Sequence, residues 1–148
     1  MKKYFFILIL ITVFLSGCAK QRTDQPNANL TENNSTPIMV KMLTQTDKST
    51  YRSYEKINLS INIISDRDLE NILIKAQGIN NDFNRSYFNQ NKTVNLKKQS
   101  PQSITLSQIL PACNSCSGLS PGQYDITVTA SYQGQTLDQA SIGLDVAQ

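Results

Sequence analysis

Two stretches of regular alternation between apolar and polar side chains constrain the fold of this chain more than any other feature. In the first, over 57–63, apolar residues occupy every second position and polar residues lie between them. The second, over 124–132, is followed by Gln133-Gly134, a pair typical of a tight turn. Alternation with period two puts one face of a β-strand in the core and the other in water. The pattern predicts two half-buried strands, the second of which turns back into a further strand over 137–146.

Shorter stretches of the same kind predict the remaining strands. They lie at 38–42, 72–76, 85–89, 93–97 and 103–109. An Asn-rich segment, 79–84, is predicted to be a loop, and Asn91 and Pro101 are predicted to separate the short strands that follow it. No helical period is found after Cys18. About seven strands without a helix indicate an all-β, antiparallel β-sandwich, and a β-barrel of similar size is the alternative.

The segment before the penultimate strand favours the sandwich. Pro121-Gly122 leads into Tyr124 at the start of that strand. This arrangement resembles the tyrosine corner of Greek-key sandwiches, in which the phenol hydroxyl hydrogen-bonds to the backbone a few residues upstream. We therefore expect Pro121, Gly122 and Tyr124 to form a structural corner.

The stretch from about 37 to 147 is also similar to the extracellular immunoglobulin-like modules of bacteria and archaea, including the CARDB type. The matching residues are Tyr54-Glu55-Lys56-Ile57-Asn58-Leu59, Asp68-Leu69-Glu70-Asn71-Ile72 and the corner segment. This resemblance implies an immunoglobulin-like sandwich over 37–148, and its motifs specify a fold and no ligand. The family often has Pro-Gly before the second strand, whereas this chain has Ser53-Tyr54.

The N-terminus has the features of a lipoprotein signal peptide. Two lysines precede an apolar run over 4–15, which is too short to span a bilayer. The run ends in Leu15-Ser16-Gly17-Cys18, which resembles the lipobox of prokaryotic lipoproteins. The resemblance implies that 1–17 is removed and that Cys18 carries acyl chains, which hold the mature protein to the outside of a membrane. An uncleaved N-terminal anchor, or secretion with Cys18 free, is the alternative.

A polar tether is expected between this anchor and the domain. Residues 18–36 contain one large apolar side chain, Leu30, among many Asn, Gln, Thr and Pro residues. Such a segment cannot bury enough surface to order itself, and as a coil it reaches about 20 to 25 Å. The residue after the lipidated cysteine is Ala19 and not Asp. In a cell with two membranes, resemblance to the sorting pattern of such lipoproteins favours the outer membrane.

Cys113 and Cys116 are the most specific local feature of the domain. In an exported protein, two cysteines in one loop are expected to form a structural disulfide. A redox dithiol needs a helix N-terminus to lower the pKa of a thiol, and the all-β context offers none. A shared metal site needs two more ligands. These two functions remain the alternatives for the pair.

Composition argues against most catalytic and nucleic-acid functions. The chain has no histidine, which removes the usual general base near neutral pH and the commonest metal ligand. Without the two leader lysines, twelve basic residues face eleven acidic ones, so no basic patch attracts nucleic acid. Asp66, Asp68 and Glu70 lie close together as possible calcium ligands, but an ordinary polar turn is favoured. We expect no enzyme activity, no cofactor and no metal.

The expected function is that of a non-catalytic binding or structural module, held to the membrane by lipid and facing an envelope protein or glycan. Tyr51, Tyr54, Phe83, Tyr87 and Phe88 are candidates for an aromatic contact face, although some must lie in the core. One alternative is a protease-inhibitor-like module that uses the 111–121 loop. A thiol redox protein that uses Cys113 and Cys116 is another.

Overall fold

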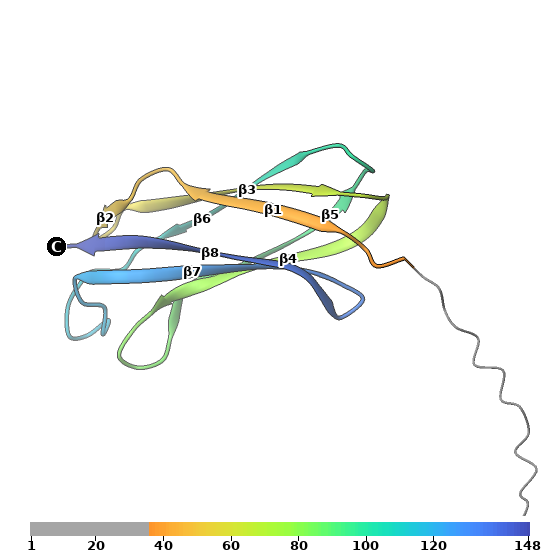
Figure 1. The fold of residues 1–148 in the computed structure, drawn as a ribbon. Coiled ribbons are helices and arrows are strands. Elements are labelled where there is room, and N and C mark those ends of the chain that lie inside the picture. Colours follow the sequence, from red (N-terminus) through yellow and green to blue (C-terminus); the bar gives the residue numbers. More distant parts are fainter. Residues whose placement is uncertain (1–35) are drawn as a thin grey trace, which may run out of the picture. The chain divides into compact units, whose positions relative to one another are not determined.

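Two β-sheets pack face to face in residues 36–148, the part of the chain that the computed structural model describes (Figure 1). The three-stranded sheet has the order β1-β3-β6, with β1 at Val40–Thr46, β3 at Lys56–Ser65 and β6 at Gln102–Ile109. The five-stranded sheet has the order β2-β8-β7-β4-β5. Its strands are β2 at Thr50–Arg52, β4 at Leu69–Asn80, β5 at Ser86–Leu96, β7 at Gly122–Tyr132 and β8 at Gln135–Ala147. The all-β sandwich is confirmed, with eight strands.

All neighbouring strands pair antiparallel except β2, which runs parallel to the end of β8. Residues 36–148 contain no helix that is long and apolar enough to cross a membrane. The signal peptide predicted over 1–17, the lipidation predicted at Cys18 and the tether predicted up to residue 36, all but its last residue, lie outside the described residues.

The core forms where the alternation predicts it. Every second residue of β3, from Ile57 to Ile63, is at most 1% exposed. In β7, Ile126, Val128 and Ala130 are fully buried, and Tyr124 and Tyr132 are partly buried. A fully buried Ile, Leu or Val side chain contributes about 1.5–3 kcal/mol relative to an exposed one. These two strands lie in opposite sheets, so their apolar faces meet across the sandwich.

Three strands differ from the prediction. Residues 79–84 were predicted to be a loop, but β4 continues to Asn80 because Ile79 is buried in the core. The sequence predicted a break at Asn91, but β5 runs through it as one strand, with Asn91 paired to Lys75 of β4. Because β5 is an edge strand and the side chain of Asn91 is exposed, a polar residue is tolerated there. The short strand β2 was not predicted, because three residues around the buried Tyr51 are too few to show a period.

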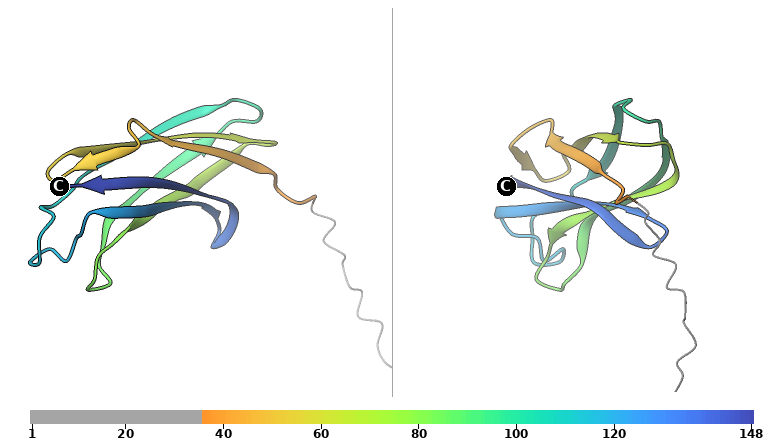
Figure 2. Two further views of the ribbon diagram at one scale, coloured as in Figure 1. Left: turned by 60° about the vertical axis from the view of Figure 1, so that its left-hand side comes forward. Right: turned by 45° about the vertical axis from the view of Figure 1, so that its right-hand side comes forward.

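The sandwich has two ends with different loops. At the N-terminal end β1 begins, and the Pro37 carbonyl accepts a hydrogen bond from Arg67 of the β3–β4 turn (3.2 Å). At the opposite end, here called the far end, lie the β2–β3 turn (53–55), the β4–β5 loop (81–85), the β6–β7 loop (110–121) and the C-terminus. Figure 2 shows the β4–β5 and β6–β7 loops projecting at the end where β8 finishes. The Cys113, Cys116 and Tyr124 features of the sequence therefore gather at the far end.

A polar network closes the connection from β1 to β2. The hydroxyl of Tyr51 donates to Asp47 Oδ1 (2.6 Å), and the backbone N–H and side-chain amide of Asn58 donate to the same carboxylate (3.0 Å each). The Tyr51 hydrogen bond, followed by those from Asn58, lowers the pKa of Asp47 from 3.8 to about 2. Burial and the neighbouring carboxylate raise the pKa of Tyr51 to about 12. The network places a hydrogen-bonded phenol inside the core.

Candidate functional site at the far end

The β4–β5 and β6–β7 loops are joined by Asn81. Its side-chain amide and the hydroxyl of Tyr87 both donate to the backbone carbonyl of Ser117. Its Oδ1 accepts hydrogen bonds from the backbone N–H groups of Phe83 (3.0 Å) and Arg85 (2.8 Å). Asn81 is only 7% exposed, so these bonds form in a site with little competing water. One side chain thus shapes the β4–β5 loop and attaches it to its neighbour.

The β2–β3 turn is joined to the same β6–β7 loop. The backbone N–H of Cys113 donates to Ser53 Oγ (2.8 Å). Two backbone hydrogen bonds follow, from Tyr54 N to the Leu110 carbonyl (3.2 Å) and from Leu110 N to the Glu55 carbonyl (2.9 Å). All three far-end loops are therefore connected by hydrogen bonds, which makes this surface preorganised.

Within the β6–β7 loop, the hydroxyl of Ser117 has the central position. Its single proton is shared between the carbonyls of Ala112 and Asn114, and its oxygen accepts from the backbone N–H of Leu119 (3.1 Å). The side-chain oxygen of Asn114 accepts a hydrogen bond from the backbone N–H of Ser117 (2.9 Å). The turn is closed by side chains of Asn and Ser, residue types that commonly bond to nearby backbone.

The predicted disulfide is not present in this loop, where both thiols are free. Cys113 is half-buried, and its Sγ lies 3.8 Å from the carbonyl oxygen of Ala147 at the end of β8. Cys116 is exposed in the turn that follows. The two side chains have different surroundings, and the bonds of Ser117 and Asn114 close the turn that a bridge was expected to close.

The corner residue Tyr124 forms the backbone contacts that its position suggests. Its hydroxyl donates to the carbonyl of Ser120 (2.7 Å) and accepts from the N–H of the same residue (3.3 Å). Pro121 and Gly122 lie between these partners, and Gly122 begins β7. The corner fixes where the β6–β7 loop rejoins the five-stranded sheet.

The aromatic candidates divide between the core and the far-end surface. Tyr51 and Phe88 are fully buried, and Tyr87 is half-buried. Tyr54 and Phe83 are 72% and 67% exposed. The ring of Phe83 lies against Gly118, where an added Cβ would come within 2.6 Å of the ring. Sequence reasoning could name the five rings but could not separate the buried ones from the exposed ones, because all five lie outside the two clearly alternating segments 57–63 and 124–132.

Tyr54 has a backbone conformation that few tyrosines adopt. Its φ is +66°, in the left-handed region, and its N–H is held by the Leu110 carbonyl. This conformation costs a non-glycine residue about 1–2 kcal/mol. An exposed ring kept in a strained turn suggests a contact residue, since no burial of the ring offsets the strain.

A hollow of about 310 Å³ lies beside these loops. The residues that line it include Asp82, Cys113, Leu119, Pro121 and Gln148. The wall of the hollow is partly polar and partly apolar, and it is formed by the β4–β5 loop, the β6–β7 loop and the C-terminus. The far end therefore combines two exposed rings with a small concavity, which is suited to contact with another molecule.

The three carboxylates considered for calcium lie at the opposite, N-terminal end. The side chain of Arg67 hydrogen-bonds to Asp66 and lowers the pKa of that carboxyl. Asp68 accepts from the backbone N–H of Lys98 (2.7 Å), which lowers its pKa in turn. Within the described residues, no group of three or more His, Cys, Asp or Glu side chains is arranged to hold a metal ion. The carboxylates of Asp66 and Asp68 act here as acceptors in an ordinary polar turn.

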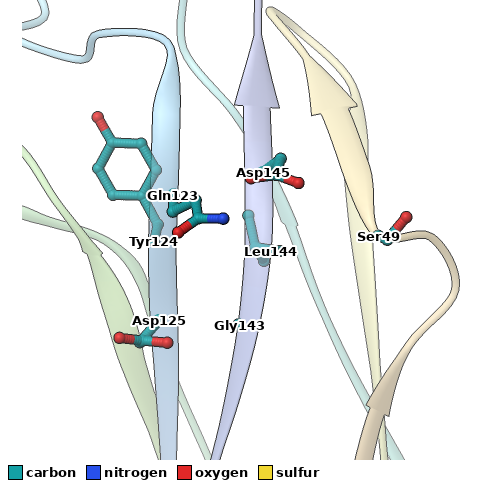
Figure 3. Close-up of a pocket in the computed structure, with 7 residues that line it drawn as sticks. All are labelled: Ser49, Gln123, Tyr124, Asp125, Gly143, Leu144 and Asp145. Carbon is teal, nitrogen blue, oxygen red and sulfur yellow. The ribbon is translucent and has the colours of Figure 1, made fainter.

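A second polar hollow, of about 320 Å³, lies on β7, β8 and the segment before β2 (Figure 3). Asp125 and Asp145 are its two charged residues, and Gly143 leaves space between them. Calcium takes six to eight oxygen ligands, so two carboxylates alone do not make a site. This surface supports no specific chemistry.

No protein-family model matches the sequence, and no curated protein matches it. Similar solved structures include the CARDB domain of a Pyrococcus furiosus protein, with a TM-score of 0.55 and 12% identity, over 74% of this chain and 95% of that one. The C-terminal domain of Wzt has a TM-score of 0.54 and 11% identity, over 74% of both chains.

A β-glucosidase from Erythrobacter marinus also contains a similar domain, with a TM-score of 0.55 and 10% identity. The match covers 74% of this chain but only 16% of the enzyme. At such low identities, these likenesses establish the fold alone: residues 36–148 form a CARDB-like, immunoglobulin-like β-sandwich.

Proposed function

We propose that this protein is a non-catalytic binding module, anchored outside the membrane by lipid on Cys18, that presents its far end to an envelope protein. The observation that carries the proposal is the far-end surface itself. Two exposed aromatic rings, Tyr54 and Phe83, stand on loops that are joined by hydrogen bonds. Aromatic side chains on preorganised loops are typical centres of protein interfaces, because little conformational entropy is lost on binding.

The direction of the chain supports this arrangement. The domain begins at the N-terminal end of the sandwich, beside the β3–β4 turn, and the far-end loops lie at the other end of the strands. A lipid anchor that precedes residue 36 would thus leave the far end accessible. The lipobox-like Leu15-Ser16-Gly17-Cys18 supports the anchor itself.

Site-specific photo-crosslinking on intact cells tests the binding role. A photoreactive residue replaces Tyr54 or Phe83, and a matched control replaces Leu73, which is 40% exposed on β4. We expect a discrete protease-sensitive adduct from the two far-end positions and none from position 73. Equal adducts from all three positions, or none from the far end, would contradict the proposal. An adduct that resists protease would point to a glycan.

The protease-inhibitor alternative is favoured by one observation. The β6–β7 loop is held in one shape by Ser117, Asn114 and Asn81, as a loop that enters a protease cleft would need to be. Incubation of the purified protein with serine and cysteine proteases tests it. Inhibition that disappears when Ser117→Ala loosens the loop would favour this alternative over partner binding through the rings.

A further inference from the structure

A small apolar surface lies on the outer face of the three-stranded sheet, at the N-terminal end of the sandwich. Met39 and Leu43 are 59% and 75% exposed there. Lys41 lies between them on the same face of β1 and pairs with Ile64 of β3. Pro101 comes immediately before β6, next to the register position of Ile64. These five residues are here called the Leu43 patch.

The patch is hollowed as well as apolar. Lys41, Leu43, Ile64 and Pro101 take part in lining a depression of about 470 Å³. A neighbouring depression of about 220 Å³ is lined by Met39 and shares Lys41 and Ile64 with the first. The surface is therefore continuous, with the aliphatic stem of Lys41 crossing its centre.

The acidic groups at the margin of the patch have partners. The carboxylate of Asp138 accepts a hydrogen bond from the backbone N–H of Met42 (2.8 Å). Asp66 is paired with the side chain of Arg67 (3.0 Å). The ammonium of Lys41 has no ion-pair partner within the described residues. The patch thus combines protruding apolar side chains with the positive charge of Lys41. Asp138 at its margin keeps its negative charge, because its partner, a backbone N–H, is neutral.

The size of the patch argues against a second protein as its occupant. A stable protein interface uses about 20–30 residues on each side. The patch consists of five residues, and polar side chains of Asn62 and Ser103 border it on the same face. Insertion into the boundary between lipid headgroups and acyl chains has no such minimum size, because its strength scales with the buried apolar area and with attraction to anionic lipids.

The position of the patch in the chain limits its distance from the proposed anchor. Roughly 18 residues separate Cys18 from the start of the domain, and even fully extended they span at most about 65 Å. An anchor at that distance raises the effective concentration of bilayer surface around the patch. Such an anchor strengthens a contact that would be too weak to hold a free protein.

We propose that the Leu43 patch rests on the bilayer surface, with Met39 and Leu43 inserted at the headgroup boundary and Lys41 beside an anionic lipid phosphate. This inference depends on the lipid anchor proposed for Cys18. In this orientation the three-stranded sheet faces the membrane, and the far end points along the membrane surface toward neighbouring proteins.

Fluorescence of the lipidated mature protein in vesicles of phosphatidylcholine and phosphatidylglycerol tests this orientation. Cys113→Ser and Cys116→Ser remove the native thiols, and an environment-sensitive dye is attached to a cysteine at position 43 or, as control, at position 73. We expect a blue shift and quenching by nitroxide-labelled lipids at position 43, and neither at position 73. Identical, water-like spectra at both positions would overturn the proposal.

Further measurements separate this proposal from the anchor and from other occupants. If the anchor is wrong, no labelled protein sediments with the vesicles, whereas a wrong orientation gives protein that sediments with a water-like dye at position 43. A blue shift already present in the vesicle-free Cys18→Ser protein would assign the patch to another part of the chain. Self-quenching that rises with protein density would assign it to a second copy. Either result would overturn the proposal.

Discussion

At the scale of single residues, Tyr54 shows how function can be recognised from local strain. Its φ of +66° is natural for glycine, and the CARDB-type modules that the sequence resembles often have glycine close to this point of the chain. Here a tyrosine occupies the position with its ring in solvent. A side chain kept in an unfavourable conformation without burial contributes nothing to the core, and this supports the contact role proposed for Tyr54.

This interpretation predicts opposite effects of one substitution on stability and on binding. Tyr54→Gly relieves the left-handed strain, and we expect the free energy of unfolding to rise by up to about 1 kcal/mol in urea titration. Crosslinking from position 83 to the partner should weaken at the same time. Tyr54→Ala keeps the strain and should weaken binding without the gain in stability. Loss of stability in Tyr54→Gly would show that the ring has a structural role.

The lowered pKa of Asp47 predicts that the stability of the fold depends on pH. Its pKa is lowered to about 2 from 3.8, chiefly by the hydrogen bond from Tyr51. A carboxyl with a lowered folded-state pKa stabilises the fold above its unfolded-state pKa, and this contribution disappears as the pH falls from about 4 to about 2. Because Asp47 is exposed to solvent, we expect the loss to be only about 1 kcal/mol.

The measurement is thermal unfolding from pH 2 to pH 6 of the natural protein and of Asp47→Asn. The asparagine variant should be less stable at pH 6 and should lose less stability on acidification. Tyr51→Phe removes the main cause of the shift and should also reduce the pH dependence. Parallel curves for the natural protein and Asp47→Asn would show that other carboxyls are responsible.

At the scale of elements, a strand could be predicted from the sequence where one of its faces is buried and the other is exposed. The segments 57–63 and 124–132 alternate because one side of each lies in the core, and both became strands as predicted. The edge strand β5 has outward Asn and Thr residues whose pairing depends on β4, so its continuity through Asn91 could not be deduced locally. The far-end site depends on contacts such as Asn81 to Ser117, between residues far apart in sequence.

The junction of the β4–β5 and β6–β7 loops predicts a large effect at Gly118. This residue has a φ of +62°, and an added Cβ would lie 2.6 Å from the ring of Phe83. Gly118→Ala therefore combines backbone strain with overpacking, and we expect a loss of about 1–3 kcal/mol in the free energy of unfolding. Gly134→Ala is the matched control, because its φ is +81° with open space around the new Cβ. Equal losses in chemical denaturation would mean that Phe83 moves aside freely.

At the scale of the whole molecule, the two ends of one sandwich have different proposed roles: membrane contact at the N-terminal end and partner contact at the far end. Burial of apolar side chains from both sheets makes residues 36–148 one compact unit. Contact made at the N-terminal end is therefore transmitted to the orientation of the far end, about the length of a strand away. The thirteen residues of β8 span roughly 40 Å at about 3.3 Å per residue, which is longer than the reach of about 20 to 25 Å expected for the proposed tether as a coil.

Membrane attachment depends, on this account, on a single thiol that lies outside the folded domain. Cys18→Ser removes the only proposed site of lipidation, so we expect the protein to move from the membrane fraction to the soluble fraction and to lose labelling by fatty acid. Circular dichroism of the soluble variant should still show a β spectrum, because within the described residues both sheets of 36–148 supply the buried core. Cys113→Ser with Cys116→Ser is the matched control and should stay in the membrane fraction with its lipid label. If Cys18→Ser also stays in the membrane fraction, an uncleaved apolar run over 4–15 holds the protein. The Leu43 patch does not explain such a result, because its contact is too weak to anchor the protein without acyl chains.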